Sequence, residues 1–458
     1  MLLGFTAVAA LAYCLSLFWL RRSVTPFMLI FLFLVSYPAR VPLIESDIDL
    51  YTVSGGHITV GRFDFSTEGY GVFYSVSLAG LGGLLCGSIA GLLLNQRTRL
   101  SYSWETNRSL PRLGSLCLFW IGTSAVLSLA CFGLGIGISG VEPPRLPLHL
   151  TGVLNLLRSF VLPAMGWFVF GLAYERRAHV LCIWLLIFNL ILGTASAYFT
   201  LSKAGLMYAV LPLVAYLVLR APPRNFTWKI LGGTVVVLVV LLPLTYFGAM
   251  VLRDESESAP AESRQESFHR VLADHGAEDD SLVQAVERTL LHLTSRVTGG
   301  SELMAITAAR PYPSDIVAQV VGGRAANDAF GGQAVFLDIF NVQLFHEDGK
   351  FSGKSFGFFG TLYLSHSHSL VFLGAAFFAA AIIWVEALAR RYANHALAVG
   401  LAFWLVLAIW ESGFDIFWLY PPLLAAMLVL ARLVQKGSKR EVQRLLPGIG
   451  VTSNAATS

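Results

Sequence analysis

Five basic residues stand where their charge could do chemistry. Four of them lie at or near the ends of separate apolar runs and one lies in a polar segment: Arg40, Arg158, Lys203, Arg253 and Arg296. A guanidinium donates parallel hydrogen bonds to a phosphate, and an ammonium adds a point charge. Such groups bind a pyrophosphate and stabilise the charge that develops as it leaves. Each residue alone also fits a structural role, because a long basic side chain can extend to lipid headgroups or pair with a carboxylate.

Three further side chains could accept a proton from a hydroxyl group. Glu411 and Asp415 lie in the short turn 411–415 before the last apolar run, and His366 opens an earlier run together with His368. A carboxylate or imidazole within reach of an acceptor hydroxyl can act as a general base. A solvated turn for the two carboxylates, and interfacial packing for the histidines, are the structural alternatives. Arg296 has one too, a solvated helix face.

Motifs for metals and nucleotides are weak. Asp47 and Asp49 could share a hard cation, but an acidic loop explains them more simply. The segment 352–355 resembles the end of a phosphate loop, although Asp348 stands where the first glycine belongs. Because no His, Cys and Asp cluster has the spacing of a metal site, we expect no metal and no cofactor.

The composition shows what must position these residues. Charged residues make up 13% of the 458, hydrophobic residues 55%, and the mean hydropathy is +0.66. Soluble domains carry roughly 25% charged residues. An ordinary soluble enzyme, a disordered protein and a nucleic-acid binder are therefore excluded, and a multi-span membrane protein remains.

Charge-poor runs of the length that a bilayer requires predict an all-α polytopic membrane protein with about 11 transmembrane helices. The runs are 2–20, 26–44, 70–94, 113–138, 154–174, 180–199, 204–219, 230–252, 370–385, 396–410 and 416–434. Arginine and lysine gather in alternate loops, beginning with Arg21 and Arg22. By the positive-inside rule these loops are cytoplasmic, and the N-terminus lies outside.

The charge distribution also divides the chain. We predict a membrane domain at 1–252 with spans 1–8, a large exported loop at 253–355 that is partly helical, a membrane domain at 356–435 with spans 9–11, and a cytoplasmic tail at 436–458. The loop holds 16 acidic and 9 basic side chains, a formal charge of −7. All the basic candidates except Arg296 then lie at outer ends of spans, where the positive-inside rule disfavours them, so a shared anionic ligand at the outer leaflet is expected.

The layout resembles bacterial oligosaccharide repeat-unit (O-antigen) polymerases of the Wzy type. The resemblance covers most of the chain as a pattern of spans, and three stretches carry its motifs. They are Pro38-Ala-Arg40, Leu201-Ser-Lys-Ala-Gly205 and the segment 353–364 after the large loop; Ser295–Gly300 is a fourth. Two positions depart from the family pattern, because Lys203 replaces an arginine and 365–369 replaces a stretch rich in Asn and Gly.

The resemblance implies a GT-C-like fold and a multi-pass protein of the bacterial inner membrane. It implies transfer of a growing polysaccharide from undecaprenyl pyrophosphate to the sugar hydroxyl of a new lipid-linked repeat unit, at the periplasmic face. The five basic residues would bind the pyrophosphate, and Glu411, Asp415 or His366 would be the base. The expected partners are the undecaprenyl-pyrophosphate-linked oligosaccharide, membrane lipids and a chain-length regulator protein.

Three other functions fit the same features. An O-antigen ligase shares the exported loop and the basic outer-face residues, and differs in its acceptor. A transporter or flippase of lipid-linked sugars would show inverted repeats and charges at mid-membrane. A structural subunit of an envelope complex would tolerate substitution of the candidate residues.

Overall fold

The computed structural model describes residues 1–45, 67–97, 113–136, 146–147, 150–200, 204–221, 225–258, 303 and 357–412. Within these ranges the regular structure is helical and contains no strand. Among the described residues, seven helices are long and apolar enough to cross a membrane, and three shorter apolar helices accompany them. The predicted class, an all-α polytopic membrane protein, is confirmed. The count of about 11 spans stays a prediction, since the run at 416–434 and nearly all of the loop at 253–355 fall outside the described residues.

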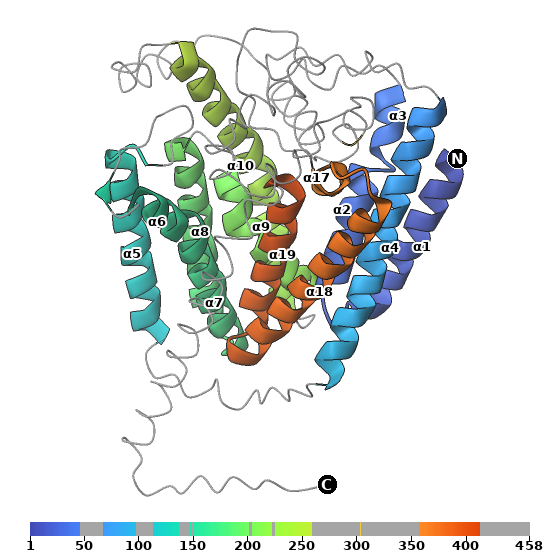
Figure 1. Ribbon diagram of the computed structural model, residues 1–458. Coiled ribbons are helices and arrows are strands. Elements are labelled where there is room, and N and C mark those ends of the chain that lie inside the picture. The colour runs from blue at the N-terminus through green and yellow to red at the C-terminus, as the bar shows by residue number, and fades with distance from the viewer. Residues whose placement is uncertain are drawn as a thin grey trace, which may run out of the picture.

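The helices follow one another along the chain with short connections in several places (Figure 1). They are α1 (Leu2–Trp19), α2 (Thr25–Ser36), α3 (Arg40–Glu45), α4 (Thr67–Arg97), α5 (Leu113–Gly133), α6 (Leu150–Leu156), a π-helical segment (Leu157–Val161), α7 (Leu162–Glu175), α8 (His179–Thr200), α9 (Ala204–Leu219), α10 (Asn225–Ser258), α17 (Phe358–Tyr363), α18 (His368–Tyr392) and α19 (His395–Ser412).

Successive long helices run in opposite directions, so the bundle has two distinct ends. The turns α1–α2, α7–α8, α9–α10 and α18–α19 lie at the lower end in Figure 1, and α3 and α17 lie at the upper end. Each of these lower turns carries arginine: Arg21, Arg22, Arg176, Arg177, Arg220, Arg390 and Arg391. We call the two ends the upper and lower end; the compartment that each faces stays a prediction.

Helix α19 joins two groups of helices. It packs against α2 and α18 on one side and against α7 and α9 on the other. Helix α7 forms the centre of the second group, because every residue from Leu162 to Tyr174 is buried. By contrast, α1 and α5 expose large apolar side chains such as Phe18 and Leu118. In a bilayer, surfaces of this kind face the lipid chains.

Helices α4 and α18 pack with their backbones in contact, and glycine makes this approach possible. A Cβ at Gly83 would lie 2.2 Å from the backbone oxygen of Phe372, and one at Gly87 would lie 2.1 Å from that of Ala376. The two glycines are four residues apart and share one face of α4. This small-xxx-small spacing lets two membrane helices approach until their backbones touch.

Two boundaries differ from the predicted ones. Helix α10 continues to Ser258, past the predicted domain boundary at residue 252, so the backbone of Arg253 belongs to this helix. Helix α19 continues to Ser412, so the backbone of Glu411 lies in its last turn instead of in a loop. Hydropathy marks where apolar residues end, whereas a helix can continue through polar residues that have a good helix propensity.

Candidate functional site

The upper end contains a short buried helix. All six residues of α17 are buried. Gly357 precedes α17 with φ 67° and ψ 165°, a conformation that glycine adopts without steric cost. After α17 the chain turns at His366, whose φ is 56°, and Ser367 caps α18 by accepting a hydrogen bond of 3.2 Å from the backbone N–H of Leu370. The chain therefore passes through the helix bundle at the upper end before α18 begins.

Aromatic rings from three helix ends meet beside α17. The ring of Tyr37, just after α2, stacks on Phe359 of α17 with centroids 4.9 Å apart and meets Trp410 of α19 edge-on at 6.1 Å. The Trp410 Nε1–H donates a hydrogen bond of 2.7 Å to Ser36 Oγ, and both residues are buried. We call Ser36, Tyr37, Phe358, Phe359 and Trp410 the upper aromatic cluster.

Two of the predicted site residues are attached to this cluster. Arg40 begins α3, is 2% exposed, and donates its backbone N–H to the carbonyl of Tyr37 over 3.2 Å. Glu411 follows Trp410 directly in α19. The side chain of Glu411 lies outside the described part of the structure. The backbones that carry a predicted phosphate ligand and a predicted base are therefore held by one set of packed rings.

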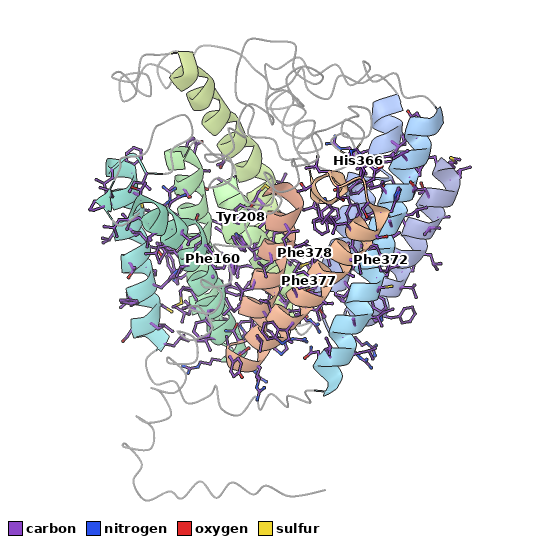
Figure 2. All side chains as sticks on the ribbon, viewed as in Figure 1. Phe160, Tyr208, His366, Phe372, Phe377 and Phe378 are labelled. Carbon is purple, nitrogen blue, oxygen red and sulfur yellow. The ribbon has the colours of Figure 1, made fainter. Side chains whose placement is uncertain are left out.

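The two histidines lie at the same end, at the α17–α18 turn. The ring of Tyr363 makes edge contacts with His366 at 5.8 Å and with His368 at 5.6 Å. His368 Nε2 is hydrogen-bonded to Ser75 Oγ of α4 over 2.9 Å. Both histidines are exposed, and Figure 2 shows His366 beside α17. His366 is thus accessible from the upper end, as a base would need to be, and His368 ties the turn to α4.

Arg158 lies elsewhere and has structural partners. It stands in the π-helical segment before α7 and is 7% exposed. Its Nη1 donates to the carbonyl of Ile136 over 3.0 Å, and its Nη2 donates to Asn155 Oδ1 over 2.9 Å. Ile136 ends the turn that closes α5. Figure 1 places α6 and α5 far from α3 in the bundle, so the structure does not bring Arg158 together with Arg40.

The other predicted residues fall partly or wholly outside the described residues. Lys203 lies in the three-residue connection between α8 and α9, and Arg253 is described by its backbone in α10. Arg296 and Asp415 lie in segments that the structure does not describe. Among the described residues, no group of three His, Cys, Asp or Glu side chains could hold a metal ion.

A buried carboxylate at the lower end was not predicted. Glu386 of α18 is 0% exposed and accepts hydrogen bonds from Ser23 Oγ, from the backbone N–H of Val24 at 3.1 Å, and from Thr25 Oγ1 at 2.7 Å. It thereby caps the N-terminus of α2. The sequence did contain a signal, because Glu386 interrupts an apolar run beside the predicted end of a span at residue 385, where a lone carboxylate is expensive.

No family model, no curated protein and no solved structure matches the chain. The fold defines its class, a multi-pass α-helical membrane protein.

Proposed function

We propose that the chain is a membrane glycosyltransferase that polymerises lipid-linked oligosaccharide repeat units. The leaving group would be undecaprenyl pyrophosphate, and the acceptor a sugar hydroxyl of the next lipid-linked unit. In this proposal the upper end faces the periplasm and the arginine-bearing lower turns face the cytoplasm of a bacterial inner membrane, in agreement with the positive-inside rule.

One observation carries the proposal. Two of the stretches that resemble the polymerase family, Pro38-Ala-Arg40 and the segment 353–364, are more than 300 residues apart in the sequence. Tyr37, which directly precedes the first stretch, stacks on Phe359 of the second with ring centroids 4.9 Å apart. Motifs that come from distant parts of a chain and converge at one end of a helix bundle are expected where a shared substrate binds.

The reaction assigns each group a role. The acceptor hydroxyl oxygen attacks the anomeric carbon, the bond from that carbon to the pyrophosphate oxygen breaks, and the pyrophosphate leaves with the bonding electron pair. Arg40 would stabilise the charge that develops on the leaving group. Glu411, Asp415 or His366 would take the hydroxyl proton. Because Arg158 is engaged with Ile136, we assign it a structural role instead of the predicted phosphate contact.

A transporter of lipid-linked sugars is the second candidate, and one observation favours it. The helix run from Leu150 to Glu175 is interrupted by the π-helical segment, and α17 is a short buried helix. Interrupted helices near a substrate are common in transporters.

The test is complementation of a strain that lacks the gene, with chain length read from a polysaccharide gel. We expect Arg40→Gln at normal protein level to lower extension by about 10²-fold or more, because loss of one group that stabilises transition-state charge costs this much. Arg40→Lys should retain part of the activity. The matched control Arg177→Gln alters an exposed arginine of the lower end and should extend normally.

The outcomes separate the candidates. A single repeat unit in the deletion strain supports a polymerase, whereas complete loss of the cap supports a ligase. Chains of wild-type length with Arg40→Gln would exclude the assigned role of Arg40. Transport of the lipid-linked unit without extension by the purified, reconstituted protein would support the transporter.

A further inference from the structure

Five arginines gather at the lower end, where three helix ends meet. Arg21 and Arg22 follow α1, Arg220 follows α9, and Arg390 and Arg391 stand in the last turn of α18. We call these five residues the lower arginine cluster. Arg220 Nη1 donates to the carbonyl of Arg21 over 2.7 Å, and Arg390 Nη1 donates to the carbonyl of Arg22. These two hydrogen bonds hold the segments of the cluster together.

Two members of the cluster face one carboxylate. Glu386 Oε1 lies 3.8 Å from Arg220 Nη2 and 3.9 Å from Arg390 Nε, so both ion pairs are longer than a hydrogen bond. The same carboxylate already accepts hydrogen bonds from Ser23 and Thr25 at the start of α2. Two guanidinium groups therefore face one carboxylate that is largely engaged elsewhere, and the other three arginines of the cluster stand exposed in the same turns.

The excess of positive charge and of hydrogen-bond donors is clearest at Arg220. Its side chain is 11% exposed, and its Nε and Nη2 atoms are buried without a hydrogen bond. Burial lowers the pKa of Arg220, the charge of Arg390 lowers it further, and Glu386 opposes both. A buried guanidinium with unused donors is costly unless an acceptor is supplied.

We propose that the lower arginine cluster binds the phosphate of an anionic lipid headgroup. Basic groups between membrane helices recognise such headgroups by charge and hydrogen bonding. The neighbouring surface favours a lipid over a soluble anion, because Leu17 and Phe18 of α1 are 46% and 79% exposed just before Arg21. An acyl chain can lie along this part of α1 while its phosphate meets the arginines. This site lies at the opposite end from the upper aromatic cluster and does not depend on the proposed function.

The test is retention of lipid by the purified full-length protein, measured by native mass spectrometry. The probes are dioleoyl-phosphatidylglycerol, dioleoyl-phosphatidylcholine and inorganic phosphate. We expect wild-type protein to retain phosphatidylglycerol in preference to phosphatidylcholine. The double variant R220Q/R390Q should lower this retention by at least about fivefold, since each arginine near a membrane surface contributes about that factor.

Two further variants keep the result interpretable. R21Q/R22Q changes two exposed side chains, so it should lower retention without disturbing folding, even if R220Q/R390Q is unstable. Arg177→Gln removes one exposed positive charge from another lower turn and should retain phosphatidylglycerol like wild type. Equal retention of the two lipids by wild-type protein would overturn the site. Full retention of phosphatidylglycerol by both double variants, R21Q/R22Q and R220Q/R390Q, would overturn it as well. Displacement of phosphatidylglycerol by equimolar inorganic phosphate would overturn its assignment to a lipid.

Discussion

Removal of the Glu386 carboxylate should destabilise the protein strongly. The substitution Glu386→Ala leaves the buried backbone N–H of Val24 and the buried hydroxyls of Ser23 and Thr25 without the acceptor that Glu386 supplies. The backbone N–H of Thr25 keeps only its longer hydrogen bond of 3.3 Å to Ser23 Oγ. The substitution also leaves Arg220 and Arg390 without the carboxylate that they face. Truncating one partner of a buried ionic network costs about 3–5 kcal/mol.

This cost can be measured as a melting shift. An unfolding entropy of about 2.1 cal/mol/K per residue gives roughly 1 kcal/mol/K for a chain of 458 residues. A loss of 1 kcal/mol then corresponds to about 1 °C, and the melting temperature of Glu386→Ala should fall by about 3–5 °C. The assay is thermal unfolding of the purified full-length protein with a thiol-reactive dye. Cys117, Cys131 and Cys182 are buried and react when the bundle opens, above a baseline from the exposed Cys14 and Cys86. Glu386→Gln keeps one acceptor oxygen and should lose about 1–3 kcal/mol.

The matched control is Glu175→Ala. Glu175 ends α7 at the same end of the bundle and is partly exposed, so its truncation should cost less than that of Glu386. A melting temperature of Glu386→Ala within about 2 °C of wild type would refute the reasoning. An equal loss in Glu175→Ala would show that the effect is not specific to the cap of α2.

Two further predictions concern the packing of the bundle. Gly87→Ala should lower the yield of folded protein and cost about 1–3 kcal/mol of stability, because its Cβ would lie 2.1 Å from the backbone oxygen of Ala376. The control Gly122→Ala meets nothing within 4 Å and should fold like wild type. A Gly87→Ala protein with unchanged yield and melting temperature would contradict the close approach of α4 and α18. Trp410→Phe and Ser36→Ala each remove the hydrogen bond between α19 and α2, and each should cost about 1 kcal/mol of stability in the same melting assay. The double variant should cost less than the sum of the two single variants. Strict additivity would mean that the two side chains do not interact.

The sequence predicted the class and most helix positions because hydropathy and charge act locally. The run at 370–385 lies within α18, and the run at 180–199 lies within α8. It could not predict the end of α10, because helix propensity continues where hydropathy stops. Among the site residues, Arg40 and His366 were placed at the same end of the bundle, as their positions in the sequence suggest. Arg158 was expected to share their ligand, but its partner Ile136 is set by how α5 ends, which local patterns do not show.

Contacts across several hundred residues were beyond sequence reasoning altogether, and α2 depends on them at both of its ends. At the lower end its first N–H groups are capped by Glu386, and at the upper end Ser36 accepts from Trp410. Both partners belong to the last described helices, α18 and α19, so the beginning of the chain is positioned by its later part. Arg40 follows α2 after a short turn, and its orientation therefore depends on the same two anchors. A substitution at Glu386 that leaves the protein folded should thus shift the position of Arg40 at the opposite end of the bundle, because a helix transmits a displacement along its axis as a rigid element.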